Sequence, residues 1–85
     1  MEYKSLVDVA KSILDENENL EFATLFEGVK EQLFSRWRDE TPEEISDQKM
    51  LENKRGELYR LLTIDGRFFY NNNGTWTSLR PEERN

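Results

Sequence analysis

Apolar residues recur at helical spacing in three stretches of the chain, and the first of these covers residues 5–16. They fall there at i, i+3, i+4, i+7 and i+8, which places one face of a helix at Leu6, Val9, Ala10, Ile13 and Leu14. Ser5, with Asp8 three residues later, is an approximate N-cap signature. The pattern predicts a helix over residues 5–16 that buries one face.

The second helical stretch is residues 24–37. Thr24 followed by Glu27 has the form of a capping box, and the apolar stripe behind it consists of Leu25, Phe26, Val29, Leu33 and Trp37. Gly28 lies inside this helix at a cost of about 1 kcal/mol relative to Ala, which indicates that another backbone packs close to it. We expect residues 36–40 to form a polar link.

The third helix has two candidate starts. Thr41 before Pro42, with Glu at the third helical position, is a strong start signal, whereas Ser46 offers a second cap and would leave residues 42–45 as a separate turn. We place the helix at residues 47–62. Its expected apolar face carries Ile45, Leu51, Leu58, Leu61 and Leu62, and Gly56 is a weak point within it.

Short aromatic and β-branched runs predict a small sheet. Residues 67–70 and 75–79 bracket an Asn-rich turn and indicate a β-hairpin, to which residues 20–22 are expected to add a third strand. Asn73-Gly74 is typical of a type I′ turn, although the Asn residues before it also allow a longer loop. Gly66 is expected at positive φ after the third helix.

The predicted order is helix, strand, helix, helix, strand, strand. This is an α+β fold with three helices and a small antiparallel sheet, in the order of a winged helix-turn-helix. Residues 1–80 are expected to form this single domain and residues 81–85 a disordered polar end. Phe68 and Trp76 are expected in the core, between the hairpin and the third helix.

Composition removes most catalytic chemistry. The chain has no Cys and no His, which excludes disulfides, thiol nucleophiles, imidazole bases and Cys/His zinc sites. Asp65 and Arg67 suit a helix cap and a strand start better than a catalytic pair. We therefore expect no catalytic residues, cofactor or metal. We also expect a cytoplasmic protein, because no leader pattern follows Met1 and no apolar run approaches the roughly 18 residues that span a bilayer.

Charge argues against DNA reading by the third helix. The chain carries 18 acidic and 12 basic residues, a net charge of −6, and phosphates repel such a chain at long range. Between residues 42 and 62, four bases face five acids: Lys49, Lys54, Arg55, Arg60, Glu43, Glu44, Asp47, Glu52 and Glu57. We favour a solvated face with pairs such as Glu52 with Arg55 over a groove reader.

The stretch from the end of the third helix into the hairpin carries a family resemblance. It runs Leu58-Tyr59-Arg60-Leu61-Leu62-Thr63-Ile64-Asp65-Gly66-Arg67-Phe68, followed by Asn73-Gly74-Thr75-Trp76 and by Leu79-Arg80. This run resembles the signature of the HARE-HTH domain, as found at the amino terminus of the delta subunits of bacterial RNA polymerase. The residues that we assign to the signature as structural are Leu58, Tyr59, Asp65, Gly66, Arg67, Phe68 and Trp76.

The resemblance implies a function that the residues alone do not. It implies a non-catalytic accessory domain that docks on core RNA polymerase and supports transcription specificity and enzyme recycling. Two departures are a return strand one residue longer and a longer connection at residues 36–45. Family members continue into an acidic tail, so we expect this chain to belong to a longer protein. The alternatives are a stand-alone DNA-binding regulator and an interaction module of a longer chain.

Two groups of residues are candidates for protein docking. The first is Arg36, Trp37 and Arg38, where an exposed Trp between two Arg would have the composition of an interface hot spot. A buried helix end with two solvated Arg is the other reading of that group. The second group is Lys54, Arg55 and Arg60. We expect a monomeric domain with no sequence-specific DNA contact and no membrane contact.

Overall fold

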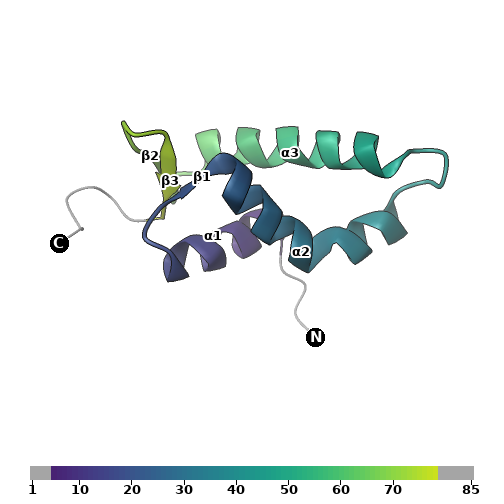
Figure 1. Ribbon diagram of the computed structural model, residues 1–85, viewed down its shortest axis with the longest axis horizontal. Helices are drawn as coiled ribbons and strands as arrows, with labels where there is room; N and C mark the ends of the chain where they lie inside the picture. The colour runs from purple at the N-terminus through teal and green to yellow at the C-terminus, as the bar shows by residue number, and fades with distance from the viewer. Residues whose placement is uncertain (1–4, 79–85) are drawn as a thin grey trace.

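The computed structural model describes residues 5–78 of the 85-residue chain. In that part the elements are α1 Leu6–Glu16, β1 Leu20–Glu21, α2 Phe22–Glu40, α3 Asp47–Ile64, β2 Phe69–Tyr70 and β3 Thr75–Thr77 (Figure 1). The predicted α+β class and element order are confirmed. The expectations for Leu79, Arg80 and residues 81–85 lie outside the described residues.

Helix α1 begins where its capping signature predicts. The Ser5 hydroxyl accepts a hydrogen bond from the Asp8 amide at 3.2 Å, and the Asp8 carboxylate accepts one from the Ser5 amide at 3.3 Å. These two bonds satisfy amides that the helix itself leaves without partners. Three residues at helical spacing on this helix, Val9, Ala10 and Leu14, are almost fully buried.

Helix α2 is longer at both ends than its sequence pattern predicts. It begins at Phe22, directly after β1, with Glu21 as an N-cap whose side chain makes no capping bond. The predicted capping box at Thr24 is therefore wrong. Pairing of β1 with β3 fixes the backbone up to Glu21, and the helix begins at the next residue, Phe22. The predicted polar link at residues 36–40 is also wrong, since these residues form the last turn of α2.

The connection from α2 to α3 is a separate turn. The Ile45 amide donates to the Pro42 carbonyl at 3.0 Å, and Ser46 caps α3 by accepting from the Lys49 amide at 3.1 Å. The stronger start signal at Pro42 thus yields only a turn. Helix α3 begins at Asp47 as predicted and continues two residues beyond the predicted end, to Ile64.

Helix α3 ends without a left-handed residue. Asp65 is the C-cap at φ −87°, and its carboxylate accepts the Arg67 amide at 2.9 Å. Gly66 does not have positive φ, so that prediction is wrong. The turn is made by the Asp65 side chain, which replaces the conformation that Gly66 was expected to supply.

The hairpin uses the longer of the two loops that its sequence allows. Within residues 5–78 only Gly74 has positive φ, at 86°, whereas a type I′ turn needs positive φ at both central residues. The Asn71 amide donates to the Thr75 carbonyl and the Gly74 amide to the Asn71 carbonyl. These bonds define a three-residue loop that closes on a left-handed glycine.

The three strands form one antiparallel sheet in the order β1-β3-β2. Leu20 and Tyr70 both lie opposite Trp76, on its two sides. The predicted addition of residues 20–22 to the hairpin is confirmed for Leu20 and Glu21, while Phe22 starts α2. Figure 1 shows the sheet beside the carboxyl end of α3, away from the turn that joins α2 to α3.

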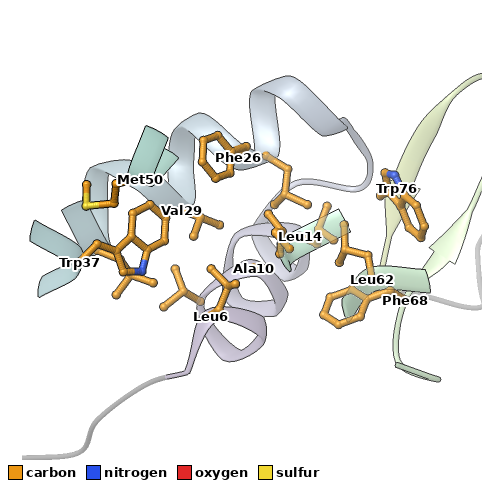
Figure 2. Close-up of a cluster of buried hydrophobic side chains, with 14 residues drawn as sticks. Leu6, Ala10, Leu14, Phe26, Val29, Trp37, Met50, Leu62, Phe68 and Trp76 are labelled. Atoms are coloured by element: carbon orange, nitrogen blue, oxygen red, sulfur yellow. The ribbon is translucent and has the colours of Figure 1, made fainter. Parts of the chain in front are cut away.

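One hydrophobic core joins the helices to the sheet. Trp37 and Met50 lie at one end of it and Phe68 and Trp76 at the other (Figure 2). The predicted burial of Phe68 and Trp76 is confirmed, whereas Met50 is a core residue that the apolar pattern missed. Among residues 5–78, no helix combines the length and the apolar character needed to cross a membrane.

Gly28 has a close neighbour, but it is a side chain. A Cβ added to Gly28 would lie 3.0 Å from Cδ1 of Ile13, on α1. The expectation of another backbone at this point is therefore wrong. Gly28 instead makes room for a branched side chain at the α1–α2 interface.

Candidate docking surface

Trp37, the centre of the first predicted docking group, is a core residue. Its side chain is 2% exposed, and its ring stacks on Phe26 with centroids 6.0 Å apart. The exposed hot-spot reading of Trp37 is thus wrong. The alternative is confirmed for the burial of Trp37 but not for the two solvated Arg, because Arg36 and Arg38 are both partly buried. The physical reason is the length of α2, which keeps Trp37 in the same apolar stripe as Phe26 and Leu33.

Arg38, from the same group, holds the turn between the helices. Its guanidinium donates to the carbonyls of Pro42 and Ile45, both at 2.8 Å, and to the Asp47 carboxylate at 2.6 Å. These bonds occupy the groups that a docking Arg would offer to a partner. Arg36 is partly buried. The first group is therefore mainly a structural element of the α2–α3 junction.

The second group lies on α3 and meets the first. Nζ of Lys54 is 5.7 Å from the centroid of the Trp37 ring and 3.6 Å from a carboxylate oxygen of Glu57. Cζ of Arg55 is 5.2 Å from the centroid of the Phe26 ring. Both cations thus cover the aromatic core from outside, with their charge toward solvent.

The outward face of α3 is largely neutralised by its own pairs. Lys49 lies 3.7 Å from Glu52, and Lys54 pairs with Glu57. The predicted pair of Glu52 with Arg55 is wrong, because Glu52 approaches Lys49 instead. Among the described residues Arg60 forms no ion pair, and it is exposed.

An exposed aromatic cluster lies beside this face, where α3 meets the hairpin. Tyr59 is 52% exposed and Tyr70 is 62% exposed. Tyr59 contacts the rings of Phe22 and Trp76 edge-on, at centroid distances of 5.4 and 6.2 Å, and Tyr70 contacts Trp76 at 5.1 Å. We call Phe22, Tyr59, Tyr70 and Trp76 the aromatic surface.

Sequence reasoning missed this surface as a functional candidate. It placed Tyr59 among the structural signature residues and Tyr70 in a hairpin strand. The available signal was the position of Tyr59 directly after buried Leu58, off the apolar stripe of α3. That offset indicates exposure, but pairing with Tyr70 becomes visible only once the hairpin folds back onto the end of α3.

A shallow depression continues the aromatic surface along α3. It encloses about 310 Å³ and is lined by Gln48, Leu51, Glu52 and Arg55. Gln48, Glu52, Arg55 and Tyr59 recur at i, i+4, i+7 and i+11, so they share one flank of the helix. The depression and the aromatic surface therefore lie one after the other along the same side of α3.

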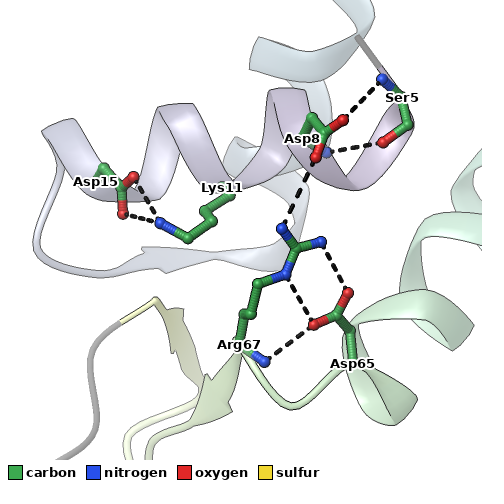
Figure 3. Close-up of polar contacts among 6 residues, drawn as sticks. All are labelled: Ser5, Asp8, Lys11, Asp15, Asp65 and Arg67. Carbon is green, nitrogen blue, oxygen red and sulfur yellow. Dashed lines mark hydrogen bonds and ion pairs between the residues drawn. The ribbon is translucent and has the colours of Figure 1, made fainter.

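Asp65 and Arg67, the pair weighed as catalytic, form a structural joint. Both carboxylate oxygens of Asp65 accept from the Arg67 guanidinium, at 3.1 and 2.9 Å, and Nη1 of Arg67 lies 3.7 Å from Asp8 on α1 (Figure 3). The Arg67 side chain and then its backbone amide lower the pKa of Asp65 below its ordinary value of 3.8, and Asp65 raises the pKa of Arg67. The pair connects the carboxyl end of α3 to the first turn of α1.

The other signature residues divide between core and surface. Leu58, Phe68 and Trp76 are buried, whereas Gly66 is exposed. Within residues 5–78 no three Asp or Glu side chains lie close enough together to hold a metal ion.

Comparison of the chain with protein-family models, with curated proteins and with solved structures finds no match.

Proposed function

We propose that this chain is a winged-helix domain of the HARE-HTH type that acts as an accessory, delta-like subunit domain of bacterial RNA polymerase. It docks on the core enzyme in the cytoplasm through protein contacts and contributes no catalytic residue. The family assignment rests on the resemblance of residues 58–80. The element order and the three-stranded sheet at the end of α3 are compatible with a winged helix and support the proposal.

The observation that carries the choice of a protein partner is the state of the cations on α3. Two of its four bases are paired with acids of the same helix, and a third, Arg55, lies on the Phe26 ring. A helix that reads the major groove needs such side chains directed at bases and phosphates. Of the bases on α3, only Arg60 and Arg55, the latter lying on the Phe26 ring, form no ion pair with a described residue, in a chain whose net charge is −6.

The exposed aromatic residues favour the same choice. Tyr and Arg are enriched among residues that dominate protein–protein binding energy. Tyr59, Tyr70 and Arg60 supply both types on adjacent elements. The surface formed by these three side chains thus has the composition of an interface with protein.

The test is retention of core RNA polymerase by the tagged chain, run beside a titration with duplex DNA at low salt. We expect polymerase retention and only weak duplex binding, without sequence preference. Submicromolar duplex binding without polymerase retention would overturn the proposal in favour of a stand-alone DNA-binding regulator. Retention of polymerase that survives nuclease treatment distinguishes protein contact from bridging by nucleic acid.

A further inference from the structure

We infer that the outward side of α3 near its carboxyl end, together with Tyr70 of β2, is a docking surface for an acidic protein segment with apolar anchors. The surface consists of Arg55, Gly56, Tyr59, Arg60 and Tyr70. This inference depends on the proposed function only for the identity of the macromolecule that carries the acidic segment. Three independent observations support it.

The first observation is the unusual exposure of two aromatic side chains over a buried one. Tyr59 and Tyr70 both lie against Trp76, which is itself only 5% exposed. The two Tyr rings are therefore held in place by a core residue and lose little rotamer freedom on binding. Preorganised aromatic rings beside an apolar floor suit an apolar anchor from a partner.

The second observation concerns Gly56. A Cβ added there would meet no atom within 4 Å, so no neighbour in the fold accounts for a glycine inside α3. Such a glycine costs about 1 kcal/mol relative to Ala. It lies one turn before Tyr59 and Arg60, where it leaves the helix backbone open to close approach by a partner.

The third observation is charge complementarity. Within residues 5–78, Arg55 and Arg60 form no ion pairs, in contrast to Lys49 and Lys54 on the same helix. Two cations on either side of Tyr59 select a partner that presents carboxylates beside its apolar anchor.

Two features make a nucleic acid the less suitable occupant. Glu52 lines the depression that continues the surface, and the chain as a whole carries a charge of −6. A continuous phosphate backbone would lie against both. A protein segment can instead place its carboxylates at the two Arg and leave Glu52 in solvent.

The experiment is an NMR titration of the ¹⁵N-labelled chain with three probes. These are a short peptide that alternates Asp with Leu or Phe, the same peptide with Lys in place of Asp, and single-stranded oligothymidylate. We expect saturable shifts of the Trp76 indole N–H with the acidic peptide alone, while the buried Trp37 indole serves as an internal reference. Tighter binding of either other probe, or saturation by none, overturns the inference.

Variants separate docking from folding. We expect Arg60→Glu and Tyr59→Ala each to weaken acidic-peptide binding roughly tenfold. The matched control is Lys49→Glu, which makes the same charge change as Arg60→Glu on α3, eleven residues earlier and outside the surface. Gly56→Ala is the sharpest variant, because it should raise the melting temperature and yet weaken binding. Unchanged affinity in Gly56→Ala and Arg60→Glu together contradicts the surface.

Peptide titration and polymerase retention together distinguish failure of this inference from failure of the proposed function. If polymerase is not retained but the acidic peptide binds as described, the surface stands and the polymerase assignment falls. If polymerase is retained but the acidic peptide does not bind, the assignment stands and the surface falls.

Discussion

Two aromatic clusters of the molecule differ in exposure: one lies on α2, and the other joins α3 to the hairpin. At one end Trp37 stacks on Phe26 and is 2% exposed, while at the other Tyr59 and Tyr70 lie over Trp76 and are more than half exposed. The difference follows from what covers each cluster. Helix α3 and its Lys54 cover the first, whereas nothing in the described part of the chain covers the second.

The contrast shows why residue type alone does not identify a docking site. Trp37 between two Arg has the composition of a hot spot, but its position in the apolar stripe of α2 places it in the core. Tyr59 has a less conspicuous sequence context and reaches the surface. The position of each residue around its helix determines that Trp37 is buried and Tyr59 exposed, whereas the neighbouring residue types do not.

The largest effect should come from breaking the buried cluster with Trp37→Ala. Loss of a buried Trp leaves a cavity that the surrounding side chains fill only in part, so we expect a loss of about 3–5 kcal/mol in the free energy of unfolding. Denaturant unfolding measures it. Tyr59→Ala is the comparison and should cost far less, since half of its side chain is already in water. Equal losses in the two variants would contradict the contrast between the clusters.

A smaller effect should follow from Arg38→Ala, which frees the turn that holds α3 against Trp37. The variant leaves the carbonyls of Pro42 and Ile45 without their charged donor. We expect a loss of roughly 1–3 kcal/mol. Asp47→Asn removes only the exposed ion-pair partner and should cost less than about 1 kcal/mol. If the two variants cost the same, the carbonyl contacts contribute nothing beyond the ion pair.

Much of the fold was predictable from the sequence because its signals are local. The capping box at Ser5, the apolar periods of the helices and the hairpin runs each depend on a few neighbouring residues. The predictions that failed required long-range information. The start of α2 at Phe22 depends on pairing of β1 with β3, and the conformation of Gly66 depends on the turn made by the Asp65 side chain.

The candidate site was less predictable than the fold for the same reason. Arg55 and Arg60 were named in advance from charge, and both lie on the surface. Their neighbour Tyr70 comes from the hairpin, and its proximity to Tyr59 through Trp76 is a tertiary contact. Arg38 was named for docking, but its carbonyl partners lie in a turn whose shape no local pattern specified.

Glycine substitutions sharpen the comparison between a packed and an open helix face. We expect Gly56→Ala to stabilise the chain by about 0.5–1 kcal/mol, because Ala has the higher helix propensity and meets no neighbour. Gly28→Ala should gain less, since its Cβ must displace Ile13 from 3.0 Å. Melting temperatures of the two variants test this order. A larger gain at position 28 would mean that Ile13 moves aside freely.

The smallest effect is a dependence of stability on pH that resides at the joint between α1 and α3. Arg67 lowers the pKa of Asp65 in the folded chain. As the pH falls, Asp65 therefore takes up its proton in the unfolded chain, near its ordinary pKa of 3.8, before it does so in the folded chain. The contribution of Asp65 is therefore complete at neutral pH and is lost as the pH falls through the folded pKa. Asp15, whose pKa is lowered by Ser78 and then by Lys11, acts in the same direction.

Asp65→Asn should remove the part of this dependence that belongs to the joint. We expect the variant to lose less melting temperature between pH 7 and pH 3 than the wild type, with a difference that shrinks in high salt because the pair is exposed. Thermal unfolding over that pH range measures this difference. Asp15→Asn is the matched control, because it removes another carboxylate of lowered pKa that lies away from the joint. An unchanged pH profile in Asp65→Asn would place the acid sensitivity of the fold elsewhere, and Arg67 would then hold the hairpin by its turn geometry rather than by its charge.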